Sequence, residues 1–149
     1  METIKRHAPT AARLLLGLVF FVFGLNGFLG FLPMPPLGDE AGAFMGALAA
    51  TGYMFPLIKG TEVVAGALLL SNRFTPLALV LLAPVLVNIV LFHAVLAPAG
   101  VVLPLFLVAL ELFLAWSYRD AFRSVLVAQA EPASAAARHP APTVASAAA

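Results

Sequence analysis

The hydrophobic positions of this chain fall into four long apolar runs, which short polar or Pro- and Gly-rich segments separate. The runs cover about residues 14–32, 54–70, 75–96 and 101–118. A helix needs about 20 mostly apolar residues to cross a bilayer, so each run is typical of a membrane-spanning helix. The pattern therefore predicts an all-α integral membrane protein, in which residues 14–118 form a four-helix transmembrane bundle.

The segments between the runs carry the signals that end helices. The first run is followed by Pro33, and proline cannot donate to the helical ladder. Pro84 lies inside the third run, where it withholds a donor from the carbonyl of Val80 and predicts a kink. The first run is longer than the apolar core of a signal peptide and has no Ala-x-Ala site, so we interpret it as a retained helix.

The segment 39–51 is apolar in part but too short to span a bilayer. It begins with Asp39 and Glu40, and acidic side chains suit the first turn of a helix. We expect a short extracytoplasmic helix between the first two crossings. Two interpretations of this helix are open: a lid over a pocket, or an Ala- and Gly-rich connector.

The two ends of the chain differ from the apolar centre. Residues 1–13 form a basic N-terminus, predicted to be cytoplasmic. Residues 119–130 are typical of an amphipathic cytoplasmic extension. Residues 131–149 are dominated by Ala, Pro and Ser, and such a tail buries too little apolar surface to offset the entropic cost of ordering, so we predict that it is disordered.

The positive charges indicate how the chain is oriented. Outside the runs they lie before the first run, between the second and third, and after the fourth: Lys5, Arg6, Arg13, Arg73, Arg119, Arg123 and Arg138. The other two loops contain no Lys or Arg. Because basic residues concentrate on the cytoplasmic side, this pattern predicts a multi-pass protein with both termini in the cytoplasm.

Composition excludes several functions. Hydrophobic residues make up 62% of the chain and charged residues 10%, so the lipid bilayer is the expected partner. The formal net charge is only +1 and no basic surface is clustered, which excludes a nucleic-acid partner. There is no cysteine, and only one of the three histidines lies inside an apolar run, so no metal site is expected. No phosphate loop, dinucleotide signature or Ser–His–Asp grouping is present.

Six polar side chains inside the apolar runs are the candidates for ligand binding or proton handling: Asn26, Lys59, Glu62, Asn88, His93 and Glu111. A charge within the bilayer costs at least about 2.5 kcal/mol, so such residues are usually paired or functional. Lys59 and Glu62 are three residues apart, which places them on one helix face and predicts an ion pair. No catalytic residue can be assigned from this set.

By helical rise, Asn26, Lys59, Glu62, Asn88 and His93 fall at similar depths, which predicts a polar pocket opening outward. Asn88 and His93 are about 140° apart around a helix, so one of them is expected to face a seam between helices. Glu111 is expected to reach Lys59 or a water. The alternatives are structural. The ion pair would fix helix register, the asparagines would link helices, and His93 would lie at the membrane interface.

Three strings of residues resemble the DoxX family of small four-helix bacterial membrane proteins. They are Arg13–Gly17 with Phe23–Gly27, Gly52–Gly66, and Ala83–His93. The resemblance implies the bacterial cytoplasmic (inner) membrane and an activity that is poorly defined. It also implies a link to sulfur and quinone oxidation systems, although the lack of cysteine excludes thiol chemistry in this chain alone.

The leading hypothesis is a membrane protein that binds a small molecule in the outward pocket as part of a redox system. No cofactor is certain, and a quinone is the one considered. Because the sequence supplies no electron carrier, a redox partner protein would be needed, as in a membrane subunit of a quinone-linked oxidoreductase. One alternative is a non-catalytic scaffold or complex subunit, including a homo-oligomer. Another is a small proton-coupled carrier with Lys59, Glu62 and Glu111 as a relay.

Overall fold

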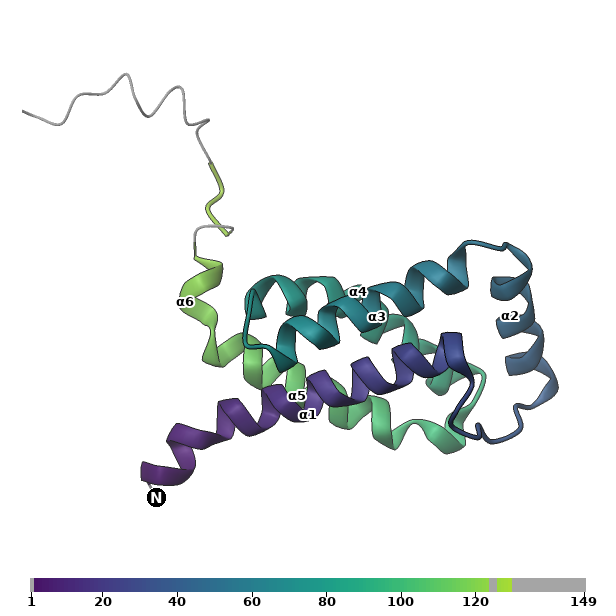
Figure 1. The fold of residues 1–149 in the computed structure, drawn as a ribbon, viewed down its shortest axis with the longest axis horizontal. Helices are drawn as coiled ribbons and strands as arrows, with labels where there is room; N and C mark the ends of the chain where they lie inside the picture. Colours follow the sequence, from purple (N-terminus) through teal and green to yellow (C-terminus); the bar gives the residue numbers. More distant parts are fainter. Residues whose placement is uncertain (1, 124–125, 130–149) are drawn as a thin grey trace, which may run out of the picture. The chain divides into compact units, whose positions relative to one another are not determined.

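The computed structural model describes residues 2–123 and 126–129, with side chains from His7 onward. In this part of the chain all regular structure is helical, which confirms the predicted all-α class. The elements are α1 (Glu2–Leu29), α2 (Asp39–Ala50), α3 (Met54–Leu70), α4 (Thr75–Val95), the 3-10 turn η1 (Pro98–Gly100), α5 (Val102–Ser117) and α6 (Arg119–Phe122) (Figure 1).

Two helices are long and apolar enough to cross a membrane by themselves: the segment His7–Leu29 of α1, and α4. A third span is reached if α2 and α3 are taken as one broken span, although they are bent by 92° (Figure 1). The helix α5 is apolar but has only 16 residues, or about 24 Å of rise. The hydrocarbon core is about 30 Å thick, so length alone supports two or three of the four predicted crossings.

The first helix differs from its predicted bounds at both ends. It begins at Glu2, well before the apolar run, and contains Pro9. It ends at Leu29, because Gly30 adopts the left-handed conformation with φ +60°. A residue without a Cβ takes this conformation readily, so the glycine ends the helix before the prolines that follow are reached.

The four longer helices pack as neighbouring pairs. The most extensive contact is between α1 and α3. The helices also pack as the pairs α3–α4, α4–α5 and α5–α1, so each of the four contacts two others. Each helix turns one apolar stripe toward its neighbours. The largest fully buried side chains come from all four helices: Leu16, Leu69, Leu82, Leu86 and Leu114.

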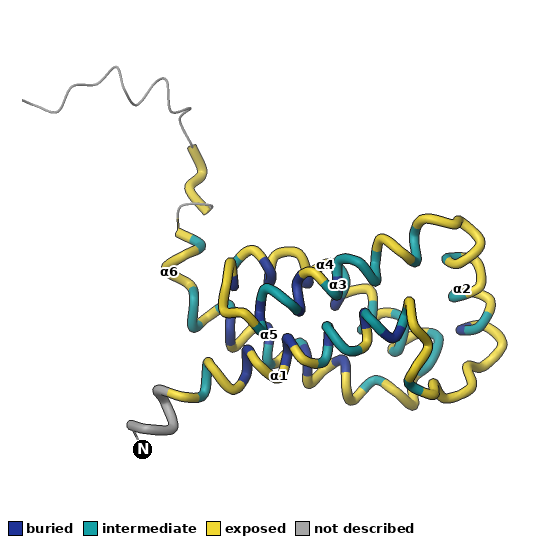
Figure 2. The backbone as a smooth tube through the Cα atoms, viewed as in Figure 1, coloured by how far each residue is buried: buried dark blue, intermediate teal, exposed yellow. Residues whose placement is uncertain are grey.

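Burial is uneven along these helices, and two ends can be distinguished. We call the end that contains Arg13, Leu70 and Thr75 the Arg13 end, and the end with α2 and Val95 the α2 end. The buried residues of α3 all lie between Glu62 and Leu69, and those of α4 stop at Leu86. In α2 only Ala41 is buried. Figure 2 shows the same contrast, with few buried positions near α2.

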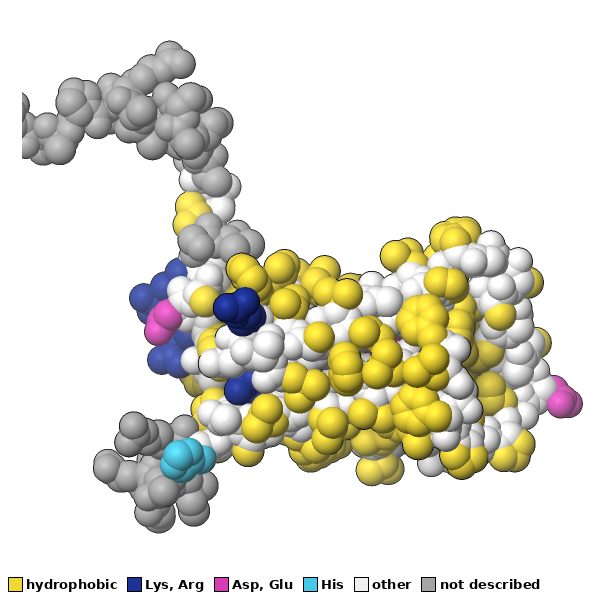
Figure 3. All heavy atoms as spheres, viewed as in Figure 1, with side chains coloured by type: hydrophobic (Ala, Val, Ile, Leu, Met, Phe, Trp, Pro, Cys, Tyr) yellow, Lys and Arg dark blue, Asp and Glu magenta, His cyan; other side chains and the backbone are white. Residues whose placement is uncertain are grey.

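Large hydrophobic side chains cover the outside of the helices. Figure 3 shows them along most of the visible flank. Exposed examples on successive helices are Leu18, Leu57, Leu77 and Leu112. A protein in water rarely exposes so much continuous apolar surface, whereas a lipid-facing surface requires it.

The segment after α5 is described in part. The expected extension 119–130 contains the four-residue helix α6 and an exposed pair in which Nε of Arg123 lies 3.2 Å from Oδ1 of Asp120. Residues 124–125 and 130 are outside the described part, as is the predicted disordered tail, 131–149.

Candidate functional site

The site is built on an unusually close contact between α1 and α3. A Cβ added at Gly66 would lie 2.6 Å from the backbone nitrogen of Phe21. A Cβ at Gly24 would lie 2.9 Å from the backbone nitrogen of Val63. Real Cβ atoms do not approach backbone atoms this closely, so the glycines allow the two helices to meet backbone to backbone.

The same contact sets the antiparallel register of the two helices. A Cβ at Gly17 would come within 2.9 Å of the Cβ of Leu69. Ten residues later, a Cβ at Gly27 would come within 2.5 Å of Cγ and Cδ of Lys59. Each turn forward along α1 thus faces a turn back along α3. This register places Lys59 and Glu62 against the glycine face of α1.

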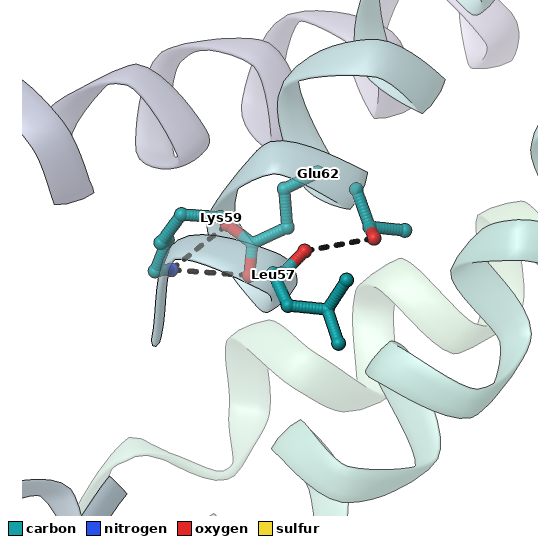
Figure 4. A network of polar contacts seen from close by, with 4 residues as sticks. Leu57, Lys59 and Glu62 are labelled. Carbon is teal, nitrogen blue, oxygen red and sulfur yellow. Dashed lines mark hydrogen bonds and ion pairs between the residues drawn. The ribbon is translucent and has the colours of Figure 1, made fainter. Parts of the chain in front are cut away.

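Lys59 and Glu62 form the ion pair that their spacing predicts (Figure 4). Nζ of Lys59 donates to both carboxylate oxygens, at 3.0 Å to Oε1 and 2.8 Å to Oε2. The Glu62 side chain is 3% exposed and the Lys59 side chain 19% exposed. The carboxylate is therefore enclosed, while the ammonium group stays partly accessible.

The surroundings of Lys59 leave part of its ammonium group accessible. Its aliphatic stem rests on Gly27, and Nζ lies 5.9 Å from the centre of the Phe55 ring. An ammonium group has three donors. Among the hydrogen bonds of the described residues, Nζ makes only the two to Glu62, which leaves one donor free. We call Gly27, Phe55, Lys59 and Glu62 the Lys59–Glu62 site.

Asn26 lies beside this site, but its carboxamide is engaged by its own loop. Its Oδ1 accepts a hydrogen bond of 2.6 Å from the backbone N–H of Leu32, and its Nδ2 donates to the carbonyl of Leu32 at 3.4 Å. Asn26 therefore does not form the predicted hydrogen bond between helices and instead fixes the loop that follows α1. Asn26 is buried, and it holds the loop rather than a neighbouring helix.

Asn88 and His93 point to different sides of α4, as their spacing requires. His93 is half-buried and continues the buried side of the helix. Its Nδ1 donates to the carbonyl of Ile89 at 2.8 Å, and its ring packs on Gly100. Asn88 is exposed, and its Nδ2 donates to the carbonyl of Pro84 at 2.9 Å. Asn88 therefore faces outward, away from the interior of the described helices.

Glu111 is buried on α5, on the same face as Leu107 and Leu114. It is 8% exposed, and no hydrogen bond or ion pair joins it to Lys59 among the described residues. The expected contact with Lys59 is therefore not formed, and the ammonium group of Lys59 donates to Glu62 instead. The relay that a proton-coupled carrier would need is therefore not connected by direct hydrogen bonds.

Arg13 is a structural residue whose role the sequence did not reveal. It is only 7% exposed, and its Nη1 donates to the carbonyl of Leu69 and, at 3.4 Å, to that of Leu70. These carbonyls lie in the last turn of α3, where the regular donors four residues further along a helix are missing. A cation also suits the negative end of the helix dipole. The sequence contained one sign of this role: Arg13 lies one helical turn before Gly17 and therefore on the same face of α1, which is buried.

The turn after α3 supplies further donors to the carbonyls at this helix end. The N–H of Arg73 donates to the carbonyl of Leu68 at 3.0 Å, and that of Asn72 donates to Leu69 at 3.2 Å. Asn72 has φ +56°, so these bonds form a Schellman motif with asparagine in the left-handed position. Arg13 completes this cap from another helix.

Comparison with protein families gives a match between this chain and the DoxX family model over residues 8–95. The match covers more than half of the 149 residues. The chain belongs to the DoxX family. The matched part of this DoxX protein ends at the last residue of α4, so it includes the Lys59–Glu62 site and His93 but leaves out Glu111. Searches of curated proteins and of solved structures found no match.

Family membership and the apolar helices together identify this DoxX protein as a membrane protein. Within it, the Lys59–Glu62 site combines a free N–H donor, a buried acceptor and an aromatic ring. A planar ring that carries carbonyl oxygens can use these features, because its oxygen accepts a hydrogen bond and its ring packs on apolar surface. The residues present therefore fit a quinone, with Lys59 and Phe55 as the groups that would hold it.

Proposed function

We propose that this DoxX protein is a multi-pass protein of the bacterial inner membrane whose helices α1, α3, α4 and α5 form a four-helix transmembrane bundle. The basic side chains Arg13, Arg73 and Arg119 lie at the Arg13 end, and Asp39 begins α2 at the opposite end. This distribution supports cytoplasmic termini and an extracytoplasmic α2. Local thinning of the bilayer would accommodate the short helices α3 and α5.

The function that the geometry supports best is binding of a small lipophilic carbonyl compound, such as a quinone, at the Lys59–Glu62 site. One observation carries this proposal. Lys59 is held by both oxygens of an enclosed carboxylate, yet it keeps a free donor and partial exposure at the more open α2 end. An ion pair that served packing alone would gain nothing from leaving this donor accessible.

The chemistry assigned to the chain follows from these two groups. A quinone, when bound, supplies the two-electron redox chemistry. Lys59 would donate a hydrogen bond from Nζ to the carbonyl oxygen of the ligand and so fix its orientation. Glu62 would hold a proton at a carboxylate oxygen next to that position. Electrons would come from or go to a partner redox protein, which makes this chain a membrane subunit of a redox system.

The test is mass spectrometry of the quinones that co-purify with the protein in mild detergent. Wild type is compared with the double variant Lys59→Ala, Glu62→Ala. The control is Thr61→Ala, because Thr61 is on the same helix and its hydroxyl donates to the carbonyl of Leu57 and not to the ion pair. A quinone in wild type and control that is lost from a folded double variant supports the proposal. Equal content in all three proteins would overturn it.

A scaffold is the second candidate, and a specific contact favours it. Gly27 packs on the stem of Lys59, and a Cβ at Gly24 would lie 3.0 Å from that of Glu62. The ion pair therefore lies in the α1–α3 contact and helps to fix its register. In a scaffold, Glu62→Gln would change assembly with partner proteins, whereas no small molecule would be found in wild type. Detection of intact complexes by native electrophoresis distinguishes these outcomes.

A further inference from the structure

An exposed stripe on α4 has the spacing of a helix–helix interface. Its members alternate at intervals of four and three residues, and all are exposed: Leu77, Leu81, Pro84, Asn88, Leu91 and Val95. The buried residues of α4 lie on the opposite face, and α2 reaches only the border of this side, where Phe44 packs on Phe92. A repeat of 3.5 residues is the pattern by which two helices pack side by side. We call these six residues the α4 stripe.

Asn88 is the polar member of the α4 stripe. A carboxamide has two N–H donors and one oxygen acceptor. One donor is used by the carbonyl of Pro84, at 2.9 Å, so the other donor and Oδ1 have no partner among the described residues. Asn88 lies seven residues from the end of α4, or about 10 Å along the helix, within the hydrocarbon region of a spanning helix. Unpaired polar groups are unfavourable there.

We propose that the α4 stripe binds the α4 stripe of a second copy of this chain. Two copies inserted in one membrane have the same orientation, so a two-fold axis along the membrane normal brings their α4 helices together in parallel. In that arrangement each stripe position meets its own counterpart. Asn88 would lie opposite Asn88 of the second copy, and each carboxamide would give its free N–H to the oxygen of the other.

The self-complementary chemistry of Asn88 is the reason to choose a second copy over another partner. A carboxamide is donor and acceptor at once, so two identical ones satisfy each other without any further group. A single asparagine within an apolar seam also fixes register and the number of helices that associate. The leucines on either side, Leu81 and Leu91, would supply the apolar contact.

Cysteine crosslinking of the full chain in native membranes tests the interface, because the chain has no cysteine of its own. Leu81→Cys and Leu91→Cys introduce single thiols in the stripe and leave Asn88 in place. Val64→Cys on α3 and Leu112→Cys on α5 are matched controls at exposed apolar positions. Oxidation should give a covalent dimer at positions 81 and 91 and little at 64 and 112. Equal yields at all four positions, or a crosslink to a different protein, would overturn the proposal.

A second comparison isolates the role of Asn88. In the Leu91→Cys protein, Asn88→Leu keeps the branched shape of the side chain but removes the carboxamide, while Asn88→Gln keeps the carboxamide. Hydrogen bonds between membrane helices are worth enough to change a dimer dissociation constant by about 3- to 30-fold. We expect Asn88→Leu to weaken the dimer by that factor and Asn88→Gln to weaken it less. An unchanged dimer in both variants would show that Asn88 does not hold the interface.

Discussion

The two ends of this protein use a buried or half-buried cation in opposite ways. At the Arg13 end, Arg13 donates to two backbone carbonyls of α3 and is almost entirely enclosed. At the α2 end, Lys59 donates to one carboxylate and keeps part of its surface accessible. Both cations lie in the α1–α3 contact. They differ in what remains for another molecule to bind.

This difference separates a structural charge from one that is available to a ligand. Arg13 satisfies acceptors that every helix end leaves open, so the fold itself explains why it is present. Lys59 pairs with a carboxylate that the fold does not require. Two apolar residues at these positions would avoid the free-energy cost of removing both charges from water. Stability does not explain this pair, whereas the proposed binding of a ligand does. Four substitutions examine this distinction.

The largest effect is expected from separating the ion pair. Lys59→Met leaves the enclosed carboxylate of Glu62 without its cation, which should reduce the free energy of unfolding by about 3 kcal/mol. Adding Glu62→Leu should restore most of the stability, since no charge is then left unpaired, but ligand content should stay low. Denaturation in detergent and quinone analysis of the same samples measure both. Recovery of the ligand together with stability would show that the pair is structural.

The next effect is expected at the opposite end. Arg13→Met leaves the carbonyls of Leu69 and Leu70 without this donor in a buried place, which should cost about 2 kcal/mol in the free energy of unfolding. Quinone content per folded molecule should not change. Arg73→Met is the control, because Arg73 is an exposed arginine in the turn directly after α3. A loss of ligand in Arg13→Met at unchanged stability would contradict the distinction between the two ends.

The glycine contact between the ends should show a smaller effect. Gly66→Ala places a Cβ against the backbone of Phe21, so the helices must separate, at a cost of about 1.5 kcal/mol in the free energy of unfolding. Gly60→Ala is the matched control on the same helix, since nothing lies within 4 Å of its added Cβ. Thermal unfolding of the two variants should differ in direction or size. Equal stability would mean that the backbone contact is looser than described.

Much of the fold follows from the sequence because its signals are local. Apolar runs predict helices, and the spacing of Lys59 and Glu62 predicts an ion pair within one helix. Contacts between distant residues are a different matter. Arg13 reaches carbonyls 56 and 57 residues away, and no local pattern encodes that distance. The start of α1 at Glu2 was missed for a related reason, because hydropathy marks the part of a helix in lipid and not its whole length.

The polar pocket was harder to predict than the helices, because it depends on which side of each helix is covered by neighbouring helices. Asn88 and His93 are both compatible with an interior position by depth, and only the packing of α4 shows that His93 continues the buried side. Asn26 binds the loop residue Leu32, which hydropathy places at the end of the first run and not in a turn. Lys59 and Glu62 remain as the part of the predicted cluster that is joined by hydrogen bonds.

The smallest effect is expected for Asn26, a structural residue that lies next to the proposed binding site. Asn26 lies next to Gly27 of the Lys59–Glu62 site, but its Oδ1 holds the N–H of Leu32. Asn26→Ala should therefore cost about 1 kcal/mol in the free energy of unfolding, the usual value of one such bond, and leave ligand content unchanged. If Asn26→Ala instead lost the ligand and kept its stability, Asn26 would belong to the binding site and not to the structural polar groups.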